Sequence, residues 1–175
     1  MSTSPNEPIF SPEKLIIAVL SAGPEYDASL PELLEQDFGP IDYRSGVLPF
    51  DYTNYYHREM GPEIKRYFFS FRDLIDPSRL AAIKRRTIEL EQRFTVEGRR
   101  KINLDPGLLS LGKLILASTK DNAQRIPLSR GIYGEITLIY RRKAFHPLPW
   151  TYPDYRSEEY QKILKDIRGI LKTQV

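Results

Sequence analysis

Residues 14–21 read Lys14-Leu-Ile-Ile-Ala-Val-Leu-Ser21, and this stretch decides how the rest of the chain is interpreted. The six residues between its two ends are all apolar, several of them β-branched, and the run stops shortly before Gly23-Pro24. A short apolar run that ends at a turn signal is typical of a buried central strand. We therefore expect a sheet that has this strand at its centre.

Helix and strand signals alternate over residues 29–95. Ser29-Leu-Pro-Glu32 is a capping-box pattern, at which a short helix is expected to begin. Gly39-Pro40 is the stop signal at which this helix ends. Asp76-Pro77 is an N-cap residue followed by proline at the first helical position, and apolar residues at helical spacing follow it. The expected elements are a helix between Ser29 and Gly39, an extended segment over 41–50, a strand over 64–71 with Tyr67, Phe69 and Phe71 on one face, and a helix over about 78–95.

The second half of the chain begins with a signal whose interpretation stays open. Asp105-Pro106 repeats the Asp-Pro helix start, and the leucines that follow it, up to Leu114 and Ile115, fit one helical face. A strand over residues 114–118 is also compatible with the sequence, and periodicity does not decide between the two. The other expected elements are a strand over 100–104, strands over 125–128 and 132–141 joined by the three-residue turn Ser129-Arg130-Gly131, and a last helix capped by Ser157 with an apolar stripe from Tyr160 to Leu171.

These elements follow one another in the order β-α-β-β-α-β, then a short helix, a hairpin and a closing helix. The opening resembles a ferredoxin-like split βαβ unit, and the hairpin would extend its sheet. We expect an α+β fold: a mixed, mostly antiparallel sheet with helices packed on one face, built as a ferredoxin-like β-α-β-β-α-β core plus a C-terminal hairpin and helix. Residues 1–13 contain three prolines among polar residues and are expected to form a flexible tail, and residues 14–175 a single domain.

The composition is that of an ordinary globular protein and excludes several classes of site. Lys plus Arg number 26 and Asp plus Glu 23, which gives a net charge of +3, and 41% of the residues are hydrophobic. The chain has no cysteine, so it has no disulfide framework, no thiolate metal site and no cysteine nucleophile. Its two histidines lie far apart, which does not favour a zinc enzyme. We assign no metal ligands, although carboxylates alone leave a Mg²⁺ site open.

Nothing in the hydropathy pattern indicates contact with a membrane. The longest apolar run, Leu15 to Leu20, is much too short to cross a bilayer. Residues 1–12 are polar and carry no Lys or Arg, so we expect no secretory signal. These observations predict a cytoplasmic protein with no membrane partner, and they predict no particular oligomeric state.

A polar string in the second half of the chain is the main candidate for a functional site. Lys120 and Arg125, with Thr119 beside them, suit a phosphate or carboxylate, since both cations and a hydroxyl can donate to one anion. Asp105, Asp121 and Glu135 are the candidate catalytic residues, as acid–base groups or as metal ligands. Two structural alternatives stay open: Asp105 as the N-cap of its helix, and Glu135 on a solvent face, paired across the hairpin.

Two segments are rich in aromatic residues. Residues 48–61 combine three tyrosines and one phenylalanine with polar side chains, and residues 147–155 hold the chain's one tryptophan among prolines. Trp150, Tyr152 and Asp154 could form a lid or a wall on which a ligand stacks. The alternative is that both segments lie over the core, which is common for loops of this composition.

Two weaker patterns concern nucleotides and nucleic acids. Residues 107–113 match the glycine and lysine positions of a phosphate-binding loop, but Leu114 stands where that loop needs Ser or Thr, and a packed leucine face explains the segment better. Basic runs at 84–86, 99–101 and 141–143 leave RNA binding open, although acidic residues are almost as numerous and no known RNA-binding string is present.

Five motifs, in this order, resemble the prokaryotic domain-of-unknown-function family 4416. They are Leu48-Pro-Phe-Asp-Tyr-Thr-Asn-Tyr-Tyr56, Asn103-Leu-Asp-Pro-Gly107, Ser118-Thr-Lys-Asp121, Gly131-Ile-Tyr-Gly-Glu135 and Trp150-Thr-Tyr-Pro-Asp-Tyr155. The resemblance runs from about Lys14 to about Tyr155 and implies no established activity, although members often carry the automated label "GTP-binding protein". It also implies a His-Arg-Ile-Tyr run where this chain reads Gln124-Arg-Ile-Pro127, so a histidine base at that position would be missing here.

Two hypotheses of different classes follow. The first is a small-molecule site for a phosphorylated or nucleotide-like ligand, with no activity or cofactor assigned. It requires Lys120, Arg125 and Glu135 to converge in space. The alternative is a non-enzymatic RNA- or protein-binding module that uses the basic runs and the Tyr-rich loop.

Overall fold

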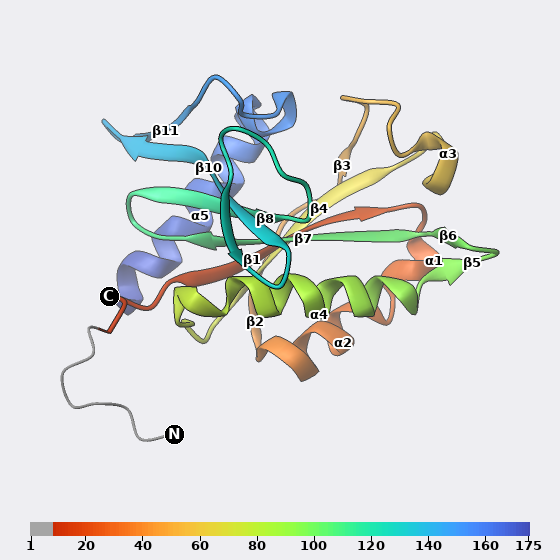
Figure 1. The fold of residues 1–175 in the computed structure, drawn as a ribbon, viewed down its shortest axis with the longest axis horizontal. Coiled ribbons are helices and arrows are strands. Elements are labelled where there is room, and N and C mark those ends of the chain that lie inside the picture. Colours follow the sequence, from red (N-terminus) through yellow and green to blue (C-terminus); the bar gives the residue numbers. More distant parts are fainter. Residues whose placement is uncertain (1–8) are drawn as a thin grey trace.

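The computed structural model describes residues 9–175 (Figure 1). The predicted tail of residues 1–13 therefore lies mostly outside the described residues, while the backbone of Glu13 pairs with that of Ile75. The strands are β1 (Lys14–Ser21), β2 (Ile41–Arg44), β3 (Leu48–Pro49), β4 (Lys65–Phe71), β5 (Thr95–Val96), β6 (Arg99–Arg100), β7 (Ile102–Leu109), β8 (Lys113–Ser118), β9 (Ile126–Ser129), β10 (Ile132–Arg141) and β11 (Ala144–Pro147). The helices are α1 (Pro24–Asp27), α2 (Leu30–Phe38), α3 (His57–Met60), α4 (Leu80–Gln92) and α5 (Glu158–Gln174), with 3₁₀ turns at Pro77–Arg79 and Pro153–Arg156.

The fold is α+β and is organised around one large sheet. Its strands follow the order β11-β10-β8-β7-β1-β4-β2, with β3 paired to β4 and β9 paired to β10. Every pairing among the described strands is antiparallel, so the expected mixture with parallel strands is not found there. β1 pairs with β4 on one side and β7 on the other, which confirms the predicted central strand. The core elements follow the expected β-α-β-β-α-β order, and the ferredoxin-like assignment stays a prediction.

Helices cover both faces of the sheet (Figure 1). Leu15, Ile17 and Val19 of β1 pack into a core with residues of α2 and α4. Ile16 and Ala18 face the opposite side, where residues of α5 cover them. Successive side chains of a strand point to opposite faces, and β1 is apolar at every position between its ends, so both faces require a cover. The expectation of helices on one face is therefore wrong for α5.

The expected helix after Asp105-Pro106 is wrong as well. β7 continues through both residues to Leu109, and β8 returns from Lys113, so the segment is a β-hairpin. The alternative of a strand over 114–118 is the one observed. The register of β7 against β1 extends over eight residues, and this tertiary pairing overrides the local Asp-Pro signal. The segment 107–113 also lacks the helix that would have to follow a phosphate-binding loop.

Most local start and stop signals have the expected structure. The Asp76 carboxylate accepts a hydrogen bond from the N–H of Ser78 at 2.8 Å, and Ser157 Oγ accepts one from the N–H of Tyr160 at 3.3 Å. Ser29, in contrast, makes no capping hydrogen bond with its side chain. The β9–β10 turn has two residues, Arg130 and Gly131, rather than three; their φ angles are +52° and +71°, as a twisted two-residue hairpin requires.

Candidate functional site

A cleft forms where β7 and β8 separate. The two strands pair only between residues 107–109 and 114–116, so the first half of β7 has no strand on that side. The α4 helix satisfies this open edge: Glu91 Oε1 accepts from the N–H of Leu104 at 2.7 Å, and Lys84 Nζ donates to the Leu104 carbonyl at 3.1 Å. Pro106, which has no N–H to leave unpaired, lies next to the point of separation. The open edge thus brings charged side chains of a helix into the cleft.

The cleft has a volume of about 700 Å³ and collects most of the predicted site residues. Seven of the nine line it: Asp105, Thr119, Lys120, Arg125, Glu135, Tyr152 and Asp154. Two do not. Asp121 is exposed outside it, and Trp150 donates its indole N–H to the carbonyl of Ile136 at 2.8 Å. The geometry therefore meets the requirement that Lys120, Arg125 and Glu135 converge.

Arg125 uses nearly all of its hydrogen-bonding capacity within the protein. Its Nε donates to Glu135 at 2.8 Å, and Nη2 donates to the hydroxyl of Tyr152 at 2.9 Å. Its Nη1 donates to Ser118 Oγ at 3.1 Å and to the carbonyl of Lys120 at 3.0 Å. The Glu135 side chain is buried, so the alternative that placed it on a solvent face is wrong, although the pairing with an arginine that belonged to this alternative is found. Arg125 therefore positions the wall of the cleft instead of offering a free guanidinium.

Arg66 forms the floor, and the sequence reasoning did not identify it. Its guanidinium carbon lies 5.1 Å from the ring centroid of Phe50, and Nε donates to the hydroxyl of Tyr160 at 3.0 Å. Its Nη atoms lie 3.6 Å from Asp105 and 3.5 Å from Asp154, longer than a charged hydrogen bond of this type. The side chain is thus fixed by its Nε and by aromatic rings, while its outer N–H groups are loosely paired.

The two carboxylates beside Arg66 have pKa values shifted in opposite directions. Burial acts to raise the pKa of Asp105, but the charges of Lys84 and Arg66 outweigh it and hold that pKa below its usual value. Burial raises the pKa of Asp154, and the nearby charge of Arg66 offsets this only in part. Neighbouring carboxylates whose pKa values are shifted in opposite directions are found in sites that bind or transfer protons, and they also occur in structural networks.

One cation in the cleft is not paired with a carboxylate. Five cationic and four acidic side chains line the cleft, and within residues 9–175 each cation except Lys120 lies in an ion pair. Lys120 Nζ instead donates to the hydroxyl of Tyr55 at 2.9 Å and lies 4.4 Å from the centroid of that ring. Its charge is exposed and free to meet an anion at the mouth of the cleft.

The residues that the sequence reasoning missed had recognisable signals. Lys84 and Glu91 lie on α4 seven residues apart, so they share a face with the apolar residue Leu80. Arg66 alternates with Ile64, which lies just before its strand, and with Phe68, and both of these are buried. A charged residue at a core position of a helix or strand is informative because burial of a charge must be compensated.

The part of the chain that the structure describes contains no group of three or more His, Asp or Glu side chains arranged to hold a metal ion. No described helix has the length and apolar character needed to cross a membrane.

An antiparallel sheet covered on both faces, with a charged cleft at the split between two of its strands, defines this α+β protein. A model of the family described as "Domain of unknown function (DUF4416)" matches residues 11–170, so the chain belongs to that family. Neither a curated protein nor a solved structure matches the chain.

Proposed function

We propose that the cleft binds a small phosphorylated or nucleotide-like molecule. The observation that carries this proposal is the convergence of seven predicted site residues on one cavity of about 700 Å³. That volume falls within the range of small-molecule sites, which are typically about 300–1,000 Å³. The proposal makes no claim about a reaction.

The phosphate of such a ligand would lie at the mouth of the cleft. Lys120 supplies a positive charge that no carboxylate neutralises, and Thr119 beside it has a hydroxyl that can donate. Arg125 supports this position indirectly, because it holds the Lys120 carbonyl and Ser118 in place.

Aromatic rings at the same mouth suit a planar or sugar-like group. Tyr55 and Tyr152 are both largely exposed and line the cleft, and Tyr55 packs edge-on against Tyr56 at a centroid distance of 5.0 Å. Partly exposed rings of this kind provide contact area at a low cost in conformational entropy.

A thermal-shift measurement tests the proposal, with GTP, ATP, GMP and inorganic phosphate, each with and without Mg²⁺. A ligand at about 100 times its Kd stabilises the folded state by about 2.7 kcal/mol, which corresponds to several degrees. We expect at least one of these compounds to shift the midpoint and Lys120→Ala to reduce that shift. Lys172→Ala, an exposed lysine on α5, is the matched control and should retain it. The proposal fails if no compound shifts the wild-type midpoint.

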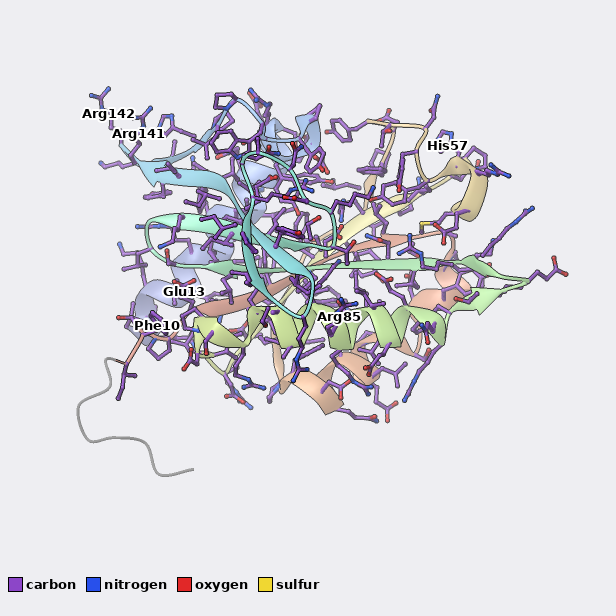
Figure 2. The ribbon with its side chains drawn as sticks, viewed as in Figure 1. Phe10, Glu13, His57, Arg85, Arg141 and Arg142 are labelled. Carbon is purple, nitrogen blue, oxygen red and sulfur yellow. The ribbon has the colours of Figure 1, made fainter. Side chains whose placement is uncertain are left out.

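The contacts of the basic runs support this proposal over an RNA-binding module. Lys84 is buried in the cleft, Arg86 pairs with Asp37, and Arg100 pairs with Glu59. The run at 141–143 is exposed, at the tip of the β10–β11 hairpin, where Arg141 and Arg142 point outward (Figure 2). Charges that are paired within the protein release few counterions on RNA, so we expect weak RNA binding even at low salt.

A further inference from the structure

The floor of the cleft has hydrogen-bond donors that the fold does not use. Within residues 9–175, Nη1 of Arg66 and the hydroxyl of Tyr155 are buried and have no hydrogen-bond partner. Both residues line the cleft, and each is 3% exposed. Buried donors without partners are rare in native proteins because each one costs free energy, so two of them in one cavity point to a ligand.

Acceptors lie next to these donors. Asp105 is 3.6 Å and Asp154 is 3.5 Å from the guanidinium of Arg66. The hydroxyl of Tyr155 is protonated at neutral pH and can donate, and burial raises its pKa further still. The floor thus offers both donors and acceptors within a small space.

The charge balance decides which chemical group fits there. Arg66 and Lys84 are balanced by Asp105 and Asp154 at the floor, and only Lys120 at the mouth lacks a carboxylate partner. A phosphate at the floor would therefore be a buried charge without compensation, which is strongly unfavourable. A hydroxyl group is neutral and both donates and accepts, so it matches donors and acceptors together.

We propose that the floor binds hydroxyl groups, and that the ligand is a phosphorylated polyol, such as a sugar phosphate, whose phosphate lies at Lys120. The hydroxyls accept from Tyr155 and Arg66 and donate to Asp105 and Asp154. This inference rests on the proposed function, and it adds the ligand's orientation and chemical class.

Calorimetric titration of the full chain with four probes tests it: ribose 5-phosphate, glycerol 3-phosphate, pentyl phosphate and inorganic phosphate. The expected result is that at least one polyol phosphate binds about tenfold or more tightly than inorganic phosphate and than pentyl phosphate, which has no hydroxyls. The variant Tyr155→Phe removes only the unpaired hydroxyl. This variant should lower the affinity for the polyol phosphate about tenfold, as expected for one hydrogen bond, and leave the affinity for inorganic phosphate unchanged.

Two further variants complete the design. Lys120→Ala should lower the affinity for polyol phosphates and for inorganic phosphate alike, because the phosphate group of each binds at the mouth of the cleft. Tyr140→Phe makes the same chemical change outside the cleft and should alter neither affinity. The thermal midpoint of the unliganded Tyr155→Phe protein should stay the same or rise, which separates a loss of binding from a loss of folding.

Three outcomes would overturn the inference. If neither polyol phosphate binds more tightly than inorganic phosphate, the floor does not bind hydroxyls. If Tyr155→Phe lowers the affinity for inorganic phosphate as well, the anion lies at the floor. If it lowers the affinity for no ligand, the unpaired hydroxyl has no part in binding. In each case a phosphorylated ligand still bound by the wild type leaves the proposed function standing, whereas binding of no phosphorylated compound removes both.

Discussion

Arg66 and Arg125 line the same cleft but differ in how much of their hydrogen-bonding capacity the protein uses. Arg125 makes four hydrogen bonds within the protein, and Arg66 makes one, from its Nε. A guanidinium has five N–H groups, so Arg125 is nearly saturated and Arg66 is not. The residue type alone therefore does not tell which arginine of a cleft is available to a ligand.

The two carboxylates beside Arg66 should affect stability with opposite pH dependence. Asp105 has a pKa lowered in the folded state, so its stabilisation is present above the unfolded value of about 3.9 and is lost as the pH falls through the folded value. Asp154 has a raised pKa, so its ionised form is disfavoured by folding. Its destabilisation appears as the pH rises from about 3.9 through the folded value.

Urea unfolding of wild type, Asp105→Asn and Asp154→Asn at several pH values between about 3 and 8 measures this difference. The free energy lost in Asp105→Asn should grow as the pH rises from the acid end. The free energy lost in Asp154→Asn should shrink, or become a gain, over the range above about pH 4. Parallel curves for the two variants would show that their carboxylates do not titrate differently.

At this scale the sequence predicted much of the cleft lining, including Asp105 and Asp154 at the floor, but not Arg66. Ser118 to Arg125 are close in the chain, and their polar side chains were expected to act together. Arg66 lies on β4, which approaches β7 only because both pair with β1. The contact between Arg66 and Asp105 depends on this strand order, which local patterns do not specify.

Among the elements, the β7–β8 hairpin determines where the cleft opens. Asp105-Pro106 has the local chemistry of a helix start, and the leucines after it fit a helical period as well as a strand. The pairing of β7 with β1 decides between them, and Gly107 allows β8 to approach β7 closely. These contacts are non-local, so the sequence pattern did not decide whether this segment forms a helix or a strand.

Gly107→Ala should destabilise the protein at this point. A Cβ at Gly107 would lie 2.8 Å from the carbonyl oxygen of Ile115 and 2.8 Å from Leu116 Cδ2, so the paired strands would have to move apart. Overpacking of this kind costs about 1–3 kcal/mol. Gly112→Ala, in the turn of the same hairpin, is the control, since nothing lies within 4 Å of its Cβ position. Equal unfolding free energies for the two variants would contradict the close approach.

The contact of α4 with the open edge of β7 can be tested through Glu91. Glu91→Met removes the acceptor for the Leu104 N–H and should cost about 2 kcal/mol, with faster hydrogen exchange at the Leu104 amide. Glu91→Gln retains an acceptor oxygen and should largely preserve the protection of that amide. Glu89→Met, on the exposed side of the same helix, removes only a surface ion pair with Arg86 and should change both quantities little. Slow exchange in Glu91→Met would mean that another group holds the edge.

For the whole molecule, the unexpected feature is that α5 covers the second face of the sheet. The apolar stripe from Tyr160 to Leu171 was recognised from sequence, but its partner was not, because a stripe does not specify which face it covers. β1 contains the missing information, since its apolar side chains alternate between the two faces. A centrally placed strand with no polar face is evidence for two covering layers.

Lys14 joins these layers and supplies the last prediction. It is fully buried, and its Nζ donates to Asp42 at 2.6 Å, to the carbonyl of Phe71 at 2.9 Å and to Gln174 at 2.8 Å, at the end of α5. Lys14→Met should cost about 3 kcal/mol in urea unfolding, because it leaves the Asp42 carboxylate partly buried without its cation.

Hydrogen exchange separates this contact from a general loss of stability. In Lys14→Met, amides in the last turn of α5 should exchange faster than the drop in global stability explains, because Gln174 loses one of its two side-chain hydrogen bonds and keeps only the one to the carbonyl of Arg72. Adding Asp42→Asn should recover part of the lost free energy, since it removes the unpaired charge. Lys65→Met, an exposed lysine at the start of β4, should change neither stability nor exchange. If Lys14→Met behaves like Lys65→Met, the hydrogen bonds of Lys14 do not contribute to holding α5 on the sheet.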